Sequence, residues 1–230
     1  MSRLLHWACV LALALVLAAD LVLELTPGIE MGAGPKLFFA AAFALFWTLA
    51  CLPLRSPKNR RRWLTVLFFY YIWLLLNVLF FDGAFGRHGI TRPQYSPGEL
   101  WELLQAGAVT EGVSMVPLRT IRNYLRAYEL GNISRELLVL NLGGNLAAFA
   151  PMGFFLPALY RWQRNPLIYV LTVGLSIAAV EVVQAAIGCG SADIDDFILN
   201  LAGAVFTWLV LWLPTYYLHR SLEPRKKVSL

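Results

Sequence analysis

The chain has 230 residues, of which 59% are hydrophobic and 14% are charged, and its mean hydropathy is +0.62. Soluble proteins average about 45 to 50% apolar and about 25% charged residues, so this composition excludes a water-soluble globule. The net charge of +5 comes from 19 Lys and Arg against 14 Asp and Glu. In a membrane protein such a surplus orients the chain in the bilayer, and with no nucleic-acid-binding motif in the sequence we expect no nucleic-acid partner.

The cysteines and histidines give no sign of a metal or cofactor site. Cys9, Cys51 and Cys189 lie in separate segments without a C-x-x-C pair, and the three histidines do not cluster. Neither a disulfide framework nor a zinc site is indicated. We therefore expect no metal and no cofactor.

Six apolar stretches are long enough to cross a bilayer, for which a helix needs about 20 residues. They cover residues 4–25, 37–54, 63–81, 137–160, 167–188 and 197–218. Each must be helical, because hydrocarbon cannot satisfy an open backbone. The sequence predicts an all-α polytopic transmembrane bundle, with membrane lipids as its surroundings.

The basic residues predict the orientation. They gather in three places on one side of the predicted bundle: Arg55, Lys58, Arg60, Arg61 and Arg62; Arg161 and Arg164; Arg220, Arg225, Lys226 and Lys227. The positive-inside rule assigns that side to the cytoplasm. Both termini are then cytoplasmic, and residues 82–136 and 188–196 face outward. The arginines within 82–136 do not overturn this, since long segments obey the rule weakly.

The first stretch has a second interpretation. Arg3 followed by an apolar run and Leu17-Ala18-Ala19 also fits a secretory signal, and cleavage near Asp20 would leave five spans. The apolar run continues to Leu25, which favours an uncleaved span.

The outer segment contains two predicted helices. Ser96 and Glu99 form a capping box around a proline at the first helical position, so a short amphipathic helix should follow. Residues 118–130 should form a second helix that ends at Gly131, and Ser134 should cap span four.

Polar side chains that a bilayer disfavours fall at one level of the predicted spans. At about 1.5 Å per residue, they lie in the outer halves of spans four, five and six: Asn141, Asn145, Glu181, Gln184 and Asn200. Residues three or four apart share a helical face, so these groups can converge. A carboxyl such as Glu181 at this depth is a functional-site candidate by default.

Charged groups stand at the mouth of the same region. Asp193, Asp195 and Asp196 precede span six, and Asp195 or Asp196 is the expected N-cap of that helix. A basic stripe upstream of span four consists of Arg119, Arg122 and Arg126, spaced to share one face. It either faces the aspartates or binds an anionic headgroup. Solvated arginines and amides that merely join helices are the plain alternatives.

Helix-breaking residues mark span four. Pro151 with Gly153 should kink it, and Gly143-Gly144 should permit close approach of another helix.

Four of these pieces together resemble the VanZ-like family of bacterial membrane proteins. They are, in order, VPLRTI at 116–121, NLGGNLAAFAPMGFFLP at 141–157, EVVQ at 181–184 and DIDDFILNLAG at 193–203. The similarity covers about residues 63–212. An asparagine often found shortly before Pro117 is missing, and Cys189 stands where members often have a basic residue.

The resemblance implies a location and a context. It implies the bacterial plasma membrane, and the founding member contributes to resistance against the lipoglycopeptide teicoplanin. The expected organisation is a two-span extension at 1–62, a VanZ-like domain at 63–217 that includes the outer segment, and a basic cytoplasmic tail at 218–230.

Three functions fit the polar region. The leading hypothesis is an outer-leaflet pocket for a lipoglycopeptide or a lipid-linked cell-wall intermediate, with this ligand-binding set: Asn141, Asn145, Glu181, Gln184, Asp193, Asp195, Asp196, Asn200 and Arg119. The second is an intramembrane enzyme with Glu181 as the catalytic base and aspartates that hold a divalent cation. The third, a proton-coupled transporter, is disfavoured because the inner halves of these helices are apolar.

Overall fold

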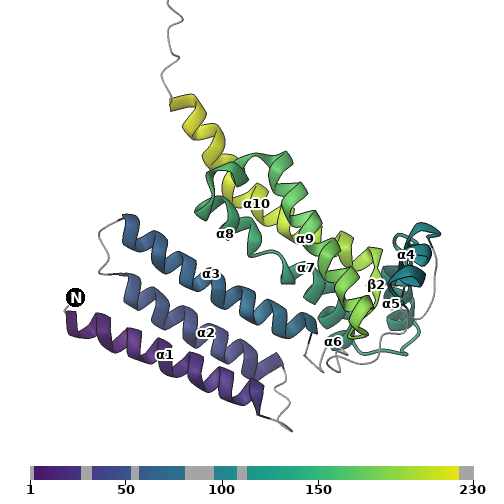
Figure 1. Ribbon diagram of the computed structural model, residues 1–230, viewed down its shortest axis with the longest axis horizontal. Coiled ribbons are helices and arrows are strands. Elements are labelled where there is room, and N and C mark those ends of the chain that lie inside the picture. Colours follow the sequence, from purple (N-terminus) through teal and green to yellow (C-terminus); the bar gives the residue numbers. More distant parts are fainter. Residues whose placement is uncertain (1–2, 27–32, 53–56, 81–95, 108–112, 223–230) are drawn as a thin grey trace, which may run out of the picture. The chain divides into compact units, whose positions relative to one another are not determined.

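The computed structural model describes residues 3–26, 33–52, 57–80, 96–107 and 113–222, with side chains described as far as Trp212. The chain forms two compact units, Met1–Arg92 and Pro93–Leu230 (Figure 1). Among the described helices, six are long and apolar enough to cross a membrane, which matches the predicted number and positions. The all-α bundle is confirmed.

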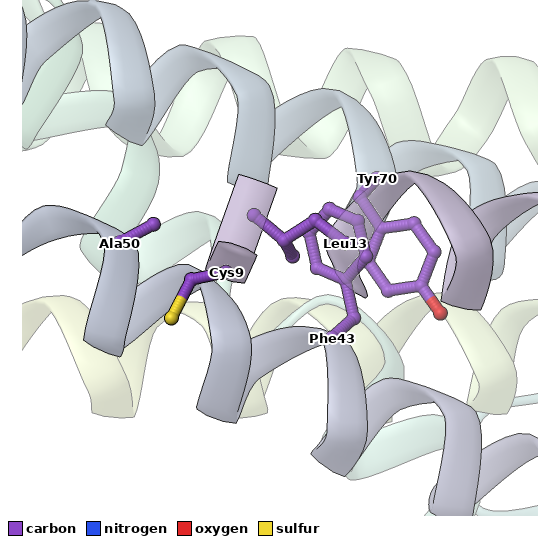
Figure 2. Close-up of a cluster of buried hydrophobic side chains, with 5 residues drawn as sticks. All are labelled: Cys9, Leu13, Phe43, Ala50 and Tyr70. Carbon is purple, nitrogen blue, oxygen red and sulfur yellow. The ribbon is translucent and has the colours of Figure 1, made fainter. Parts of the chain in front are cut away.

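The first unit consists of three helices, α1 (Arg3–Leu25), α2 (Ala33–Cys51) and α3 (Pro57–Phe80). Their common core contains Cys9, Leu13, Phe43, Ala50 and Tyr70 (Figure 2). Phe43 and Tyr70 stack with ring centroids 3.7 Å apart. The outward-facing side chains are also large and apolar, as expected of helices surrounded by lipid.

The second unit begins with α4 (Pro97–Gln105), a two-residue strand β1 (Val113–Ser114) and α5 (Arg119–Glu129). The capping box at Ser96 is confirmed, since Ser96 and Glu99 exchange side-chain and backbone hydrogen bonds. Gly131 ends α5 as predicted, with φ of +72°. The N–H of the next residue, Asn132, donates to Ala127 at 2.8 Å and completes a Schellman motif.

Span four is broken into pieces. It runs through α6 (Arg135–Leu138), the π-helical turn η2 (Val139–Gly143), α7 (Gly144–Ala148) and α8 (Met152–Leu159). The predicted cap at Ser134 is present, because its hydroxyl accepts from Leu137 N at 3.2 Å. The predicted kink is a full interruption before Pro151, whose ring and missing N–H disrupt the helix. The π-turn was not predicted.

Spans five and six are the long helices α9 (Pro166–Ile187) and α10 (Ile194–Leu222). A 3₁₀ turn, η3 (Arg161–Arg164), leads into α9, and the strand β2 (Ala192–Asp193) precedes α10. β2 pairs in parallel with β1, so that Val113 is opposite Ala192 and Ser114 is opposite Asp193. This pairing was not foreseen, and it joins the predicted outer segment to the turn between spans five and six.

Helices α7 and α8 pack closely against α10. A Cβ added to Gly203 would come within 1.7 Å of the Leu146 carbonyl oxygen, and one added to Gly153 within 2.6 Å of the Trp208 nitrogen. Small residues let membrane helices approach in this way. A close approach was predicted at Gly143-Gly144, and at Gly143 an added Cβ would meet only Val139 of its own segment, at 3.7 Å.

Candidate ligand-binding site

A set of carboxylates gathers where α5, α9 and α10 meet. Glu181 lies near the end of α9, Asp193 is in β2, and Asp195 is in the first turn of α10. All three side chains are buried, and Asp195 is only 1% exposed. Buried carboxylates require hydrogen-bond donors, and the structure shows where these come from.

Asp195 binds the start of α5 through its two oxygens. Oδ1 accepts the backbone N–H of Leu118 at 2.5 Å, and Oδ2 accepts that of Ile121 at 3.1 Å. Leu118 is the N-cap residue of α5, has φ of 63°, and provides no side-chain cap of its own. A residue distant in sequence therefore caps this helix, and the negative charge lies at the positive end of its dipole.

Asp193 joins three segments. Its Oδ1 accepts the backbone N–H of Asp195 at 2.8 Å, and its Oδ2 accepts the hydroxyl of Thr120 at 2.6 Å. Its own backbone N–H donates to Glu181 Oε2 at 3.3 Å. One aspartate therefore links α5, α9 and α10.

The N-cap of α10 differs from the prediction. The helix begins at Ile194 and Asp193 accepts from its second N–H, so Asp193 is the cap rather than Asp195 or Asp196. The expected start was three residues too late, because the apolar run begins only at Phe197. Asp195 and Asp196 instead lie in the first turn, where they are still favourable to the helix dipole.

The predicted amides lie beside this network. Asn145 donates through Nδ2 to Asp196 Oδ1, and Asn200 donates to the Asp196 carbonyl at 2.9 Å. Asn141 donates to the Leu137 carbonyl at 2.8 Å. Asn141, Asn145 and Asp196 are half-buried, whereas Asn200 is 2% exposed.

The remaining predicted residues differ in their placement. Gln184 is fully buried on α9, one turn beyond Glu181. Arg119 is exposed at the first position of α5, and no ion pair joins it to a carboxylate of the described chain. The contact between α5 and the aspartates is made by backbone amides and by Thr120, which sequence reasoning did not single out. The only sign of Thr120 was its place in the VPLRTI stretch.

The electrostatic environment of Asp193 follows from its burial. Desolvation raises the pKa of the Asp193 carboxyl above its ordinary value of 3.8, although the hydrogen bonds from Thr120 and Asp195 oppose the shift.

Among the described residues, no group of three or more His, Cys, Asp or Glu side chains has an arrangement suited to a metal ion.

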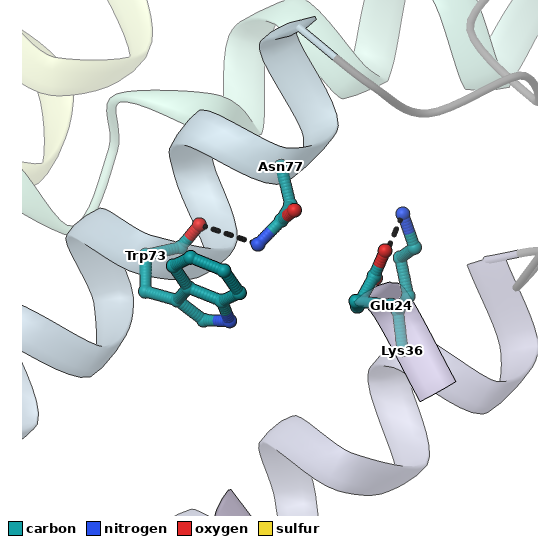
Figure 3. Close-up of polar contacts among 4 residues, drawn as sticks. All are labelled: Glu24, Lys36, Trp73 and Asn77. Carbon is teal, nitrogen blue, oxygen red and sulfur yellow. Dashed lines mark hydrogen bonds and ion pairs between the residues drawn. The ribbon is translucent and has the colours of Figure 1, made fainter. Parts of the chain in front are cut away.

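A separate polar group lies within the first unit. Glu24 and Lys36 form an ion pair at 3.1 Å, and Asn77 donates to the Trp73 carbonyl at 3.1 Å (Figure 3). Asp20 is fully buried, with Tyr70 and Trp73 as polar neighbours. Lys36 lies at the edge of the second apolar stretch, and nothing in the sequence indicated that it would be buried in an ion pair.

Six described helices of this length and composition define a multi-pass membrane protein. Residues 68–215 match the family model VanZ/LLP1, and the chain belongs to this family. Comparisons with curated proteins and with solved structures give no match. The family match begins inside α3 while the compact units divide after Arg92, so the expected boundaries at residues 62 and 217 remain predictions.

Proposed function

We propose that this VanZ/LLP1 family member binds the polar part of an amphiphile at the half-buried groups around Asp196, in the outer half of the membrane. The observation that carries the proposal is the Asn145–Asp196 hydrogen bond beside a network of buried carboxylates. Polar groups at the ends of membrane helices are costly unless they have partners, and they commonly mark binding sites. The ligand class is a lipoglycopeptide or a lipid-linked cell-wall intermediate.

Burial divides the predicted site residues into two roles. The support consists of the buried residues Glu181, Gln184, Asp193, Asp195 and Asn200, which position the ends of α5, α9 and α10. The contact set consists of the accessible residues Asn141, Asn145, Asp196 and Arg119. A support that is already hydrogen-bonded holds the contact set in place without reorganisation when the ligand binds.

The contact set suits a ligand that carries both sugar or peptide groups and negative charge. The amides of Asn141 and Asn145 can donate and accept, Asp196 accepts from hydroxyl and amine groups, and a guanidinium such as Arg119 pairs with phosphate or carboxylate. The acyl chains of the same ligand would remain in lipid. Binding of teicoplanin-type compounds at this site would contribute to resistance.

The proposal includes the orientation inferred from the basic residues, with both termini in the cytoplasm of a bacterial cell and the α9–α10 turn outside. Reporter fusions after Gly190 and after residue 56 test it. An external signal from the first and a cytoplasmic signal from the second are expected, and the reverse pattern would remove the site from the outer leaflet.

Binding is tested with the purified full-length protein in nanodiscs. The probes are fluorescent teicoplanin and a fluorescent lipid-linked disaccharide-peptide, titrated against wild type, Asp196→Asn and the matched control Glu129→Gln. Both substitutions remove one negative charge, but Glu129 is exposed on α5 and outside the site. We expect Asp196→Asn to weaken binding about tenfold or more, as removal of a charged hydrogen-bond partner does, at unchanged thermal stability.

Equal affinity in all three proteins would contradict the proposed site. Chemical conversion of the lipid-linked probe by wild type, lost in Glu181→Gln, would instead support the intramembrane enzyme.

A further inference from the structure

Beyond Arg119, the helix α5 carries a surface that the proposed site does not use. Its basic stripe, Arg119, Arg122 and Arg126, is exposed along one face. None of these arginines forms an ion pair with a described residue. Glu129 is the one acidic residue in Arg119–Glu129, so the helix has a net positive surface.

An exposed apolar edge borders the stripe. Leu118 and Leu125 are each 44% exposed, and Arg122 lies between them at spacings of four and three residues. Tyr128 and Leu130 are also exposed at the end of the helix, and no residue of α5 is buried. Large apolar side chains beside exposed arginines are typical of helices that lie in a membrane surface.

Both ends of α5 are fixed at the ends of candidate membrane spans. Its first turn is bound by Asp195, at the start of the span Ile194–Trp212. Its last turn leads through Gly131 and Ser134 into the span Arg135–Leu159. A helix held at both ends in this way lies at the level of the headgroups.

We propose that α5 is an interfacial helix whose basic stripe binds the phosphates of anionic phospholipids while Leu118, Leu125 and Tyr128 enter the acyl boundary. Guanidinium groups pair with phosphate through two parallel hydrogen bonds, and their long stems allow the charge to stay in the headgroup layer. Each basic side chain near an anionic surface strengthens binding about fivefold. Arg119 is shared with the contact set around Asp196, whereas Arg122, Arg126 and the apolar edge are not part of it.

The experiment measures amide hydrogen exchange of the full-length protein in two kinds of nanodisc. One contains only phosphatidylcholine, and the other contains phosphatidylcholine and phosphatidylglycerol in equal parts. We expect exchange in residues 121–130 to be slower in the anionic nanodiscs, and the difference to shrink at high salt because the attraction is electrostatic. Exchange in α9 should be the same in both and serves as the internal reference.

Variants separate charge from structure. Arg122→Gln with Arg126→Gln should lower the lipid-dependent difference by about 25-fold or abolish it, while the matched pair Arg122→Lys with Arg126→Lys should keep most of it. Glutamine and lysine are both good helix formers, so α5 itself should persist. Equal exchange of wild-type α5 in the two lipids would overturn the proposal, as would an undiminished difference in the glutamine variant. Loss of protection in α9 as well would show that the glutamine variant has unfolded. The exchange of wild-type α5 in the two lipids and at high salt then decides the proposal.

Discussion

The carboxylate of Asp195 accepts the backbone N–H of Leu118, although the two residues are 77 positions apart. Together with the bond to Ile121, this contact supplies the N-terminal cap that α5 lacks locally. The start of α5 therefore depends on the α9–α10 turn. Both Asp195 oxygens accept from backbone N–H groups, and a backbone N–H can only donate a hydrogen bond.

Asparagine substitutions at Asp195 and Asp193 should have unequal effects. Asp195→Asn turns one acceptor into an NH₂ group facing a backbone N–H, and loss of a buried partner costs about 1 to 3 kcal/mol. Asp193→Asn can keep both bonds, because the Thr120 hydroxyl can accept from the new amide. We expect a clearly lower melting temperature in nanodiscs for Asp195→Asn and a small change for Asp193→Asn. Equal losses in the two variants would show that the cap is not the determining contact.

The stability contribution of Asp193 should depend on pH. Burial raises its pKa in the folded protein above the ordinary 3.8, so the folded state holds the proton more tightly than the unfolded state. This contribution is fully present below the ordinary pKa and is lost as pH rises through the folded value. Melting temperatures measured from pH 4 to pH 7 should therefore fall more steeply with pH in wild type than in Asp193→Asn. Parallel curves would show that Asp193 does not titrate in this range.

Gly203→Ala should prevent correct packing of α7 on α10. The added Cβ would lie 1.7 Å from the Leu146 carbonyl oxygen, which is backbone and cannot move aside cheaply. We expect a loss of about 3 kcal/mol or more, seen as a lower yield of monodisperse protein and a lower melting temperature. Gly98→Ala is the matched control, because nothing lies within 4 Å of its added Cβ. A Gly203→Ala protein as stable as this control would contradict the close approach of the two helices.

Removal of Lys36 should destabilise the first unit more than removal of the whole ion pair. Lys36 and Glu24 are mostly buried, at 8% and 12% side-chain exposure. Lys36→Met leaves Glu24 without its cation and should cost about 3 to 5 kcal/mol, while replacement of both partners by apolar or neutral groups costs far less. A double-mutant cycle of Lys36→Met and Glu24→Gln, followed by thermal unfolding, measures the difference. Additive effects would mean that the pair is not coupled.

The sequence predicted those parts of the fold that local chemistry determines. The spans follow from apolar length, and the caps at Ser96, Ser134 and Gly131 follow from residues close to the helix ends that they satisfy. Membership in the VanZ/LLP1 family also followed from short motifs in the right order.

The contacts that join distant segments were not predictable. Nothing local to Asp195 indicates that its partner is the start of α5, and two-residue strands such as β1 and β2 leave no periodic signal. Lys36 was missed because a charge at the edge of an apolar stretch is normally interpreted as a solvated end. The ligand-binding roles of the predicted site residues remain predictions.

Backbone hydrogen bonds within the chain bridge the interruption of span four. Across it, Ala150 N donates to Ala147, Met152 N to Phe149 and Gly153 N to Ala150, all at 3.0 to 3.2 Å. Tighter turns thus replace helical bonds lost at the break, and the side chains of Phe149 and Met152 on either side of Pro151 are buried. The break can therefore lie at hydrocarbon depth, because these N–H groups bond to carbonyls of the chain rather than to water, and the same bonds set the direction in which α8 continues.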